Sequence, residues 1–467
     1  MIKTRFAPSP TGHLHLGNVR TALFSWLIAK KHHGHFVLRI EDTDAERSQD
    51  EHIDTLCNDL RWLGLDWQEG PQVNDADNGP YRQSQRSSLY ADYYARLETA
   101  GQAYACFCSK EKLAQARAAQ RAAGKPPRYP GTCARLDPAE AKRRLEAGEK
   151  ATLRFRVSAG DQIQFTDLVR GPQTFASDDI GDFVIRRTDG TPAFFFSNAI
   201  DDALMGITHV LRGEDHLTNT PRQLLLLQAL DLPLPGYGHL PLVLAAGGGP
   251  LSKREGAASL QYYQAKGVKP LALANYLARL GHHFSNDDFM SFADLADGFD
   301  LAHVGKAPAH FDSQQLEHWQ REAVLKQDDA ACAQWLDKAL ARVPKTQRTA
   351  LATALQPNVL YPFEAAQWAD ILFGPGFYYS QPARDVLQNA GTGFFDTAIQ
   401  AVENNGDDYP AVTAALKETG VKGKNLFQPL RFAVTGRKHG PELAALFTLL
   451  GKERLIEKLQ RARQESQ

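Results

Sequence analysis

The sequence has few cysteines and lacks any long apolar run. Its five cysteines among 467 residues are an odd number, which does not fit a complete disulfide framework and favours a reducing compartment. The first ten residues, MIKTRFAPSP, lack the apolar core of a secretion signal. Apolar runs such as LLLLQAL (224–230) are much shorter than the roughly 20 residues that span a bilayer. We therefore expect a cytoplasmic protein with no membrane partner.

The sequence also lacks an excess of charge of either sign. Lys and Arg number 53, Asp and Glu number 54, and the formal net charge is -1. Such a balance neither indicates nor excludes a nucleic-acid partner, because local patches decide that interaction. The content of 43% hydrophobic and 23% charged residues is typical of a globular protein, and the length predicts two to four domains.

The first forty residues predict a strand, a helix and a second strand. Residues 2–6 alternate in polarity, and HFVLRI (35–40) is a second short apolar run. Between them, apolar residues recur on one helical face, with an expected N-cap at Asn18 and an end near Gly34. A βαβ unit of this kind favours a parallel sheet.

Changes in composition along the chain predict four regions. The boundaries that we expect are 1–85, 86–195, 196–325 and 326–467. The first and third form one α/β domain, and the second is an inserted module with β-type runs at 151–157, 182–190 and 192–202. A buried strand is expected at 207–216, followed by an acidic and polar loop and then a helix within TNTPRQLLLLQAL (218–230). The last region has the periodicity of amphipathic helices throughout.

A phosphate-binding helix N-terminus is expected in RFAPSPTGHLHLGN (5–18). Unpaired backbone N–H groups and the helix dipole attract anions there, two glycines admit close approach, and His13 and His15 add imidazole donors. The Walker pattern is absent. A second motif, LSKRE (251–255), places Lys253 and Arg254 in a glycine-rich loop. The first motif alone also fits a plain helix entry with two surface histidines, and LSKRE alone is most often an ordinary solvated basic turn. Together they suit nucleotidyl transfer from ATP.

Together the motifs resemble a known family. HLGN (15–18) resembles the HIGH motif of class I aminoacyl-tRNA synthetases, and LSKRE resembles their KMSKS loop. The segments 5–44, 186–216 and 429–436 are similar to bacterial glutamyl-tRNA synthetases, so the resemblance covers nearly the whole chain. It implies a Rossmann-type parallel-sheet catalytic domain, an inserted acceptor-binding module and an all-α anticodon-binding region.

The resemblance also implies an activity and its partners. It implies that L-glutamate is activated by ATP with Mg²⁺ to glutamyl-adenylate and that glutamate is then transferred to the 3′ end of tRNA(Glu). It also implies that the enzyme is a monomer. The implied catalytic residues are His13, His15, Lys253 and Arg254, and the implied ATP-binding residues are Gly12, His15, Gly17, Asn18 and Lys253. Glutamate is implied to contact Arg5, Ser9, Glu41, Phe194, Asn198 and Arg212. A strand-end ion pair is the structural alternative for Arg5 and Glu41, and Arg212 has the same alternative.

Three features depart from the family pattern. Pro250 stands where the KMSKS-like loop usually begins with Lys, and Phe194 stands where a substrate-facing Tyr is usual. The third departure concerns Cys106, Cys108 and Cys133, which have the spacing of a zinc site, but Arg135 occupies the usual position of the fourth ligand. Tyr129 is a possible oxygen ligand. A zinc site and three free thiols therefore both remain open.

Several alternative functions compete with the glutamate–tRNA ligase. The enzyme could be non-discriminating and also charge tRNA(Gln). A catalytically weak RNA-binding paralogue has Pro250 and Phe194 as its support. A relative that glutamylates a modified tRNA base lacks the anticodon-binding region, and glutaminyl-tRNA synthetases have a β-barrel there. The helical pattern after residue 330 disfavours both.

Overall fold

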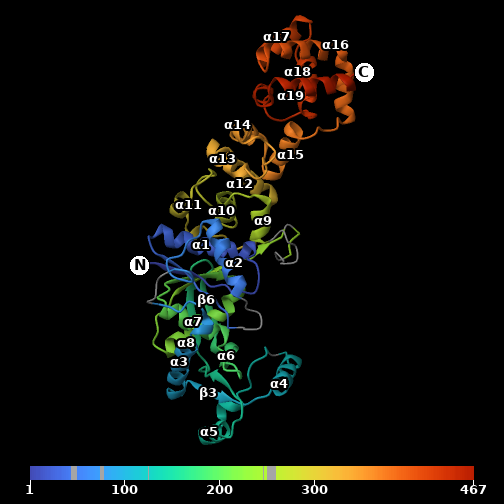
Figure 1. Ribbon diagram of the computed structural model, residues 1–467. Coiled ribbons are helices and arrows are strands. Elements are labelled where there is room, and N and C mark those ends of the chain that lie inside the picture. The colour runs from blue at the N-terminus through green and yellow to red at the C-terminus, as the bar shows by residue number, and fades with distance from the viewer. Residues whose placement is uncertain (44–49, 74–77, 125, 246, 250–258) are drawn as a thin grey trace. The chain divides into compact units, whose positions relative to one another are not determined.

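The computed structural model describes residues 1–467 except 44–49, 74–77, 125, 246 and 250–258 (Figure 1). Pro250, Lys253 and Arg254 therefore lie outside the described residues. The chain divides into two compact units, the first comprising Met1–Tyr262 with Leu273–Ser313, and the second Tyr263–Ala272 with Gln314–Gln467. None of the helices in the described ranges is both long and apolar enough to cross a membrane. The four predicted region boundaries stay predictions.

The first unit is built on a four-stranded parallel sheet. Its order is β2-β1-β8-β9, with β1 (Lys3–Phe6), β2 (His35–Leu38), β8 (His209–Gly213) and β9 (Gly236–Leu240). Helix α1 (Leu16–Lys31) connects β1 to β2, and α8 (Thr220–Ala229) connects β8 to β9. The predicted strands, the helix after the strand at 207–216 and the parallel pairing are confirmed. Because β1 pairs with β8, the carboxyl ends of strands about 200 residues apart in the chain meet at one edge.

Helix α1 begins earlier than predicted. His15, not Asn18, is the N-cap, and its Nδ1 accepts a hydrogen bond from the Asn18 backbone N–H at 3.3 Å. The prediction failed because it considered only the usual Ser, Thr, Asp and Asn caps, whereas the imidazole lone pair satisfies the same unpaired donor. Asn18 consequently lies in the first turn.

The segment between β2 and β8 carries two antiparallel sheets. One has the order β3-β4-β7, and the other is the hairpin of β5 and β6. Aromatic side chains, among them Tyr94, Phe155 and Phe183, form a core with α3. The strands predicted at 151–157 and 182–190 are confirmed. The elements are β3 (Ala103–Cys106), β4 (Thr152–Phe155), β5 (Gln162–Asp167), β6 (Gly171–Ala176), β7 (Phe183–Arg186), α3 (Ser87–Thr99), α4 (Lys110–Ala122), α5 (Pro138–Glu146) and α6 (Ser177–Ile180).

The β-type run expected at 192–202 is wrong. These residues form most of helix α7 (Phe194–Leu204). Three consecutive phenylalanines suggested a strand, but in the helix Phe196 stacks on Tyr94, with ring centroids 4.3 Å apart. The same helix directs Asn198 and Asp202, one turn apart, into polar contacts. Tertiary packing thus overrides local β propensity.

The remaining elements of the first unit are short or peripheral. They are α2 (Asp50–Leu63), β10 (Val243–Leu244), α11 (Phe292–Gly298), β11 (Ala309–His310) and 3-10 turns at Gln83–Gln85, Cys133–Arg135, Glu214–Asn219 and Leu301–His303. Helices α9 (Leu260–Lys266) and α10 (Pro270–Arg279) contribute residues to both units.

The second unit is helical, as predicted. Its core consists of apolar side chains such as Leu387, Phe395, Leu430 and Phe447. Two long helices change direction at glycines with positive φ, at Gly391 and Gly451. The elements are α12 (Ser313–Leu325), α13 (Asp329–Leu336), α14 (Lys345–Leu355), Gln356–Asn358 (3-10), α15 (Pro362–Phe373), α16 (Gln381–Asn405), α17 (Tyr409–Glu418), α18 (Lys424–Thr435) and α19 (Leu443–Glu465).

Candidate active site

One pocket lies where the carboxyl ends of β1 and β8 meet the N-terminus of α1. Its volume is about 470 Å³. Ligands of open α/β sheets bind at this edge. The predicted residues that line it are Arg5, Ser9, Gly12, His13, His15, Gly17, Asn18, Glu41, Phe194, Asn198 and Arg212. All predicted glutamate contacts and every predicted ATP-site residue among the described ones therefore share one cavity.

The helix end in this pocket is shaped by its glycines. A Cβ on Gly17 would approach two atoms of the His15 ring to 3.2 Å, so glycine leaves room for the capping imidazole. Gly12 has a φ of 140°, a conformation that side chains disfavour. His13 is exposed. Because the first turn of α1 presents backbone N–H groups at the positive end of its dipole, this part of the pocket favours an anion.

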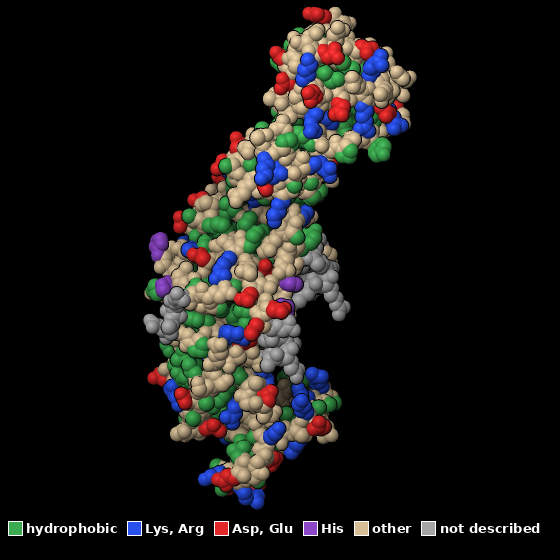
Figure 2. Space-filling view, viewed as in Figure 1, with side chains coloured by type: hydrophobic (Ala, Val, Ile, Leu, Met, Phe, Trp, Pro, Cys, Tyr) green, Lys and Arg blue, Asp and Glu red, His purple; other side chains and the backbone are tan. Residues whose placement is uncertain are grey.

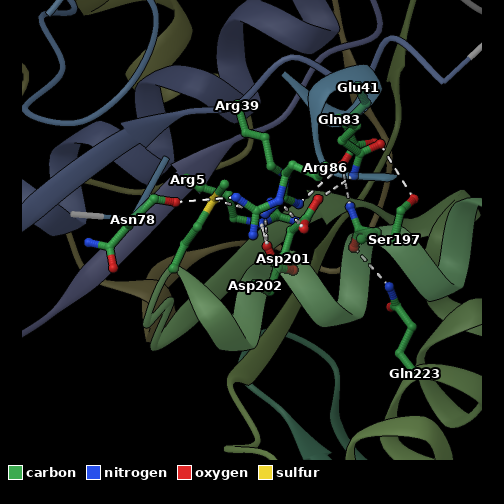
Figure 3. Close-up of polar contacts among 12 residues, drawn as sticks. Arg5, Arg39, Glu41, Asn78, Gln83, Arg86, Ser197, Asp201, Asp202 and Gln223 are labelled. Carbon is green, nitrogen blue, oxygen red and sulfur yellow. Dashed lines mark hydrogen bonds and ion pairs between the residues drawn. The ribbon is translucent and has the colours of Figure 1, made fainter. Parts of the chain in front are cut away.

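Buried charged groups form a network beside the pocket (Figure 3). Arg5 Nε donates to Asp202 Oδ1 at 3.1 Å, and Arg39 Nη1 donates to the same oxygen at 2.7 Å. Arg39 Nη2 donates to Glu41 Oε1 at 3.1 Å, as does Asn198 Nδ2 at 2.6 Å. The strand-end ion pair considered for Arg5 and Glu41 is thus replaced by two other pairs, Arg5–Asp202 and Arg39–Glu41.

The two carboxylates of this network differ in their electrostatic environment. Burial alone raises the pKa of Asp202, but the nearby guanidinium groups of Arg39 and Arg5 outweigh it and lower that pKa below its usual value. Burial raises the pKa of Glu41 above the usual value, although Arg39 and Arg5 oppose the shift. Glu41 is therefore the carboxylate that gains most from a further positive partner, such as a substrate ammonium group.

Arg212 is a buried cation whose hydrogen-bonding groups are not all used. Its Nε donates to His239 Nε2 at 3.1 Å and its Nη2 to Thr220 Oγ1 at 2.8 Å. Its Nη1 has no hydrogen-bond partner among the described residues. Burial lowers the pKa of Arg212 to about 10, so it remains charged at neutral pH. A charged donor without a partner at a pocket wall suits a carboxylate ligand.

Sequence reasoning missed the residues that support these contacts. Arg39, directly after β2, and Asp202, on α7, are fully buried and pair with each other, and Gln223 donates to Asn198 Oδ1 at 2.8 Å. The charged Arg39 within the apolar run FVLRI was a detectable signal. The expected strand at 192–202 concealed that Asn198 and Asp202 share a helix face.

The cysteine cluster lies outside the pocket lining. The Sγ atoms of Cys106, Cys108 and Cys133 all lie within 4.8 Å of one another, and those of Cys108 and Cys133 are 3.7 Å apart. The Tyr129 hydroxyl is 3.4 Å from Cys106 Sγ and 3.5 Å from Cys108 Sγ. Burial alone raises the pKa of the Cys106 thiol, but hydrogen bonds with Tyr129 and Arg154 outweigh burial and lower that pKa to about 7. All five cysteines are free of disulfides.

Comparison with known proteins agrees with this architecture. Residues 1–318 match the family described as tRNA synthetases class I (E and Q), catalytic domain, and residues 380–463 match an anticodon binding domain. Residues 1–318 thus form the catalytic domain of a class I tRNA synthetase. The chain is 54% identical over 461 residues to glutamate–tRNA ligase 2 of Nitrosococcus oceani, covering 98% of each chain. It is 51% identical to glutamate–tRNA ligase 2 of Alkalilimnicola ehrlichii, covering 99% of this chain and 98% of that relative.

A solved structure extends the comparison to three dimensions. A glutamate tRNA ligase from Elizabethkingia meningosepticum, in complex with its amino acid, superposes with a TM-score of 0.90 at 28% identity and covers 99% of both chains. The chain belongs to the glutamate–tRNA ligase family. The predicted family and fold class are confirmed, and the weakly active paralogue is not favoured. The roles of single site residues stay predictions.

Proposed function

We propose that this glutamate–tRNA ligase performs both of its chemical steps with the pocket at the carboxyl ends of β1 and β8. The proposal rests on three charged or polar groups that this pocket brings together. A buried guanidinium with an unused donor, a buried carboxylate and the positive end of a helix all face one cavity. Glutamate and a nucleoside triphosphate need these three groups.

In this proposal each charged group of glutamate has its own partner. The ammonium group binds Glu41, whose position Asn198 and Arg39 fix. The side-chain carboxylate binds Arg212 Nη1, with Arg5 nearby. Ser9 is a polar contact, and Phe194 forms an apolar wall whose ring lies 5.2 Å from that of His216. The α-carboxylate then remains free to react.

Activation is a substitution at phosphorus. An oxygen of the α-carboxylate attacks the α-phosphorus of ATP, the bond to the bridging oxygen of the β-phosphate breaks, and pyrophosphate leaves. Mg²⁺, when bound with ATP, would neutralise part of the phosphate charge. His13, His15 and the N–H groups at the start of α1 stabilise the reacting phosphate, and Gly12, Gly17 and Asn18 line the path of the triphosphate. Lys253 and Arg254, outside the described residues, are proposed to neutralise the leaving pyrophosphate.

Transfer completes the reaction on tRNA. A hydroxyl oxygen of the terminal ribose attacks the carbonyl carbon of glutamyl-adenylate, AMP leaves and the hydroxyl proton is released. Helix α4 is a candidate for contact with the acceptor end, since it buries none of its residues. It exposes Lys110, Lys112, Arg117 and Arg121, and Figure 2 shows Lys and Arg side chains on this part of the surface.

The same pocket accounts for selection against glutamine. Arg212 offers the charged donor Nη1 to a carboxylate, whereas the amide of glutamine would leave this buried donor unmatched or meet it with another donor. Sites built on such hydrogen bonds discriminate by roughly 10⁴–10⁵ without editing. We therefore propose that the amino acid is selected by binding alone.

The cysteine cluster fits a structural zinc ion. Tetrahedral coordination with Zn–S bonds of about 2.3 Å separates the sulfurs by roughly 3.8 Å. The 3.7 Å between Cys108 and Cys133 agrees with this spacing. The Tyr129 oxygen lies 3.4 Å from Cys106 Sγ and 3.5 Å from Cys108 Sγ, which supports its choice as the fourth donor. We propose that Cys106, Cys108, Cys133 and Tyr129 hold zinc. Metal analysis of purified protein should give about one zinc per chain, lost in Cys133→Ser, whereas no zinc would leave three free thiols.

The activity is tested by charging purified tRNA(Glu) and tRNA(Gln) with labelled glutamate, with Lys253→Ala as control. We expect charging of tRNA(Glu) alone, lost in the variant. Charging of both would define a non-discriminating enzyme, and charging of neither would overturn the proposal. The free thiols favour a cytoplasmic location, which fractionation would test. We propose a monomer, to be tested by light scattering.

A further inference from the structure

Arg212 is hydrogen-bonded to a line of connected, buried polar side chains that substrate binding alone does not explain. His239 and Thr220 accept its hydrogen bonds, and both are fully buried. His239 Nδ1 in turn lies 2.5 Å from Asp167 Oδ2, and Asp167 is also buried. None of the three lines the pocket. This hydrogen-bonded line of residues runs from Arg212 at the pocket through His239 on β9 to Asp167 at the end of β5, in the β5–β6 hairpin.

The contacts determine the tautomer of His239. Arg212 Nε always carries its proton, so the His239 Nε2 that it contacts must offer a lone pair. In a neutral ring the proton then sits on Nδ1, which donates to Asp167. Burial lowers the pKa of His239, in agreement with a neutral ring. Asp167 thus selects the tautomer that can hold Arg212.

Asp167 itself is fixed by backbone donors. Its Oδ1 accepts hydrogen bonds from the N–H groups of Val169, Arg170 and His239, at 2.9, 2.8 and 3.2 Å. The adjoining Arg170 pairs with Glu214, whose Oε1 accepts from the Leu242 N–H at 3.0 Å. The turn of the hairpin is thereby fastened to the ends of both β8 and β9. Oδ2 remains to orient the imidazole.

We propose that Asp167 and His239 are positioning residues for glutamate recognition: they fix the guanidinium of Arg212 so that Nη1 is the donor left for the substrate side-chain carboxylate. This inference rests on the proposed role of Arg212 as the carboxylate ligand. Both residues act through Arg212 and touch neither substrate nor ATP.

The isosteric variant Asp167→Asn tests the inference. Its Oδ1 can still accept the backbone hydrogen bonds, but an amide NH₂ replaces the acceptor that faces Nδ1. The imidazole then takes the other tautomer, and its Nε2–H faces the N–H of Arg212. In aminoacylation by the full chain, we expect kcat/KM for glutamate to fall about tenfold, through KM, because a charge-assisted hydrogen bond is lost. KM for ATP should change less than about twofold.

A double-mutant cycle with Arg212→Ala separates positioning from general structural damage. If Asp167 acts through Arg212, Asp167→Asn should lower kcat/KM for glutamate about tenfold in the wild type and less than about twofold in the Arg212→Ala background. An equal loss in both backgrounds would overturn the inference. Asp182→Asn is the matched control, because Asp182 accepts from Tyr104 and lies outside this line. It should leave kcat/KM for glutamate unchanged.

The outcomes also distinguish the two proposals. If Arg212→Ala lowers kcat/KM for glutamate but Asp167→Asn does not, the positioning inference fails and the proposed carboxylate role of Arg212 stands. If Arg212→Ala has no effect, the carboxylate role fails and the inference fails with it. Should Asp167→Asn not fold, His239→Asn replaces it in the cycle. This variant retains a donor for Asp167 but removes the acceptor for Arg212, so a smaller loss of about threefold is expected, again only when Arg212 is present.

Discussion

The interiors of the two units differ in what they bury. In the first unit Arg5, Arg39, Glu41, Asp202 and Arg212 are all at most 6% exposed. In the second unit the buried polar residues among those described are uncharged: Gln320, Thr413, Thr435 and Ser466. Ion pairs of the second unit, such as Arg463–Asp396, lie at its surface.

The buried charges of the first unit indicate where its function is located. A buried charge is unfavourable unless it is paired, so a folded core retains several only when they serve a purpose such as binding a charged ligand. Arg5, Glu41 and Arg212 line the pocket, and Asp202 and Arg39 pair with the first two of them. The second unit has an apolar core that serves packing, and its recognition of RNA must use exposed cations and aromatic rings. The following predictions test this contrast.

The largest effect is expected for Asp202→Asn. This variant keeps the shape of the side chain but leaves the buried guanidinium groups of Arg5 and Arg39 with less compensating charge. We expect the first unit to lose about 3–5 kcal/mol of unfolding free energy. Urea denaturation, monitored with a spectroscopic probe placed in the first unit, measures the change in unfolding free energy. A loss below about 1 kcal/mol would show that the network contributes little to folding.

A smaller but specific effect is expected for Glu41→Gln. Loss of the carboxylate should reduce kcat/KM for glutamate roughly thirtyfold, which corresponds to about 2 kcal/mol, because the proposed charge-assisted hydrogen bond to the ammonium group is lost. Burial raises the pKa of Glu41, so the charged form is lost at a higher pH than for an ordinary glutamate. The wild-type kcat/KM for glutamate should therefore fall as pH falls through this raised pKa.

The pH dependence of Glu41→Gln provides the control. The amide does not titrate, so the decline on the acid side should be absent or much weaker in this variant. Measurements of kcat/KM for ATP over the same pH range separate this effect from general inactivation. An unchanged decline in the variant would assign the titration to another group.

In the second unit we expect a modest effect of Tyr378→Ala on tRNA. Tyr378 is 93% exposed, which suits stacking on an unpaired base. Loss of one stacked base should cost about 1 kcal/mol of binding free energy and so raise KM for tRNA roughly fivefold. The melting temperature of the protein should not change. Phe363→Ala is a matched control, since that ring is also exposed but already stacks on Tyr361. Equal effects of the two variants would contradict a specific contact of Tyr378.

The smallest effect is expected for Asp396→Asn. The Arg463–Asp396 pair is half exposed on both sides, so water and salt screen it. We expect a loss of no more than about 1 kcal/mol in the unfolding free energy of the second unit. The same urea method applied to Asp202→Asn and Asp396→Asn compares a buried with an exposed carboxylate. The comparison measures how much burial changes the contribution of a carboxylate to the free energy of unfolding. Similar losses in the two variants would remove the contrast between the units.

Much of the fold could be predicted because its signals are local. The strand, helix and strand at the start of the chain follow from hydrophobic periodicity over forty residues, and the helical pattern after residue 326 covers most of the second unit. The spacing of Cys106, Cys108 and Cys133 likewise predicted a cluster that the structure brings together. The strand expected at 192–202 failed because three phenylalanines favour a strand locally, whereas packing on Tyr94 and the contacts of Asp202 favour a helix.

Local residues specify the helix N-terminus with glycines and two imidazoles that follows the first strand, because a helix start depends on neighbouring residues. The pairing of the buried charges, in contrast, depends on how distant segments pack together. Arg5 and Asp202 are 197 residues apart in the chain, and Arg39 and Asp202 are 163 apart. The link from Asp167 through His239 to Arg212 also depends on where the hairpin lies against β9. Such pairings require the packing of the whole first unit, and no local pattern contains them.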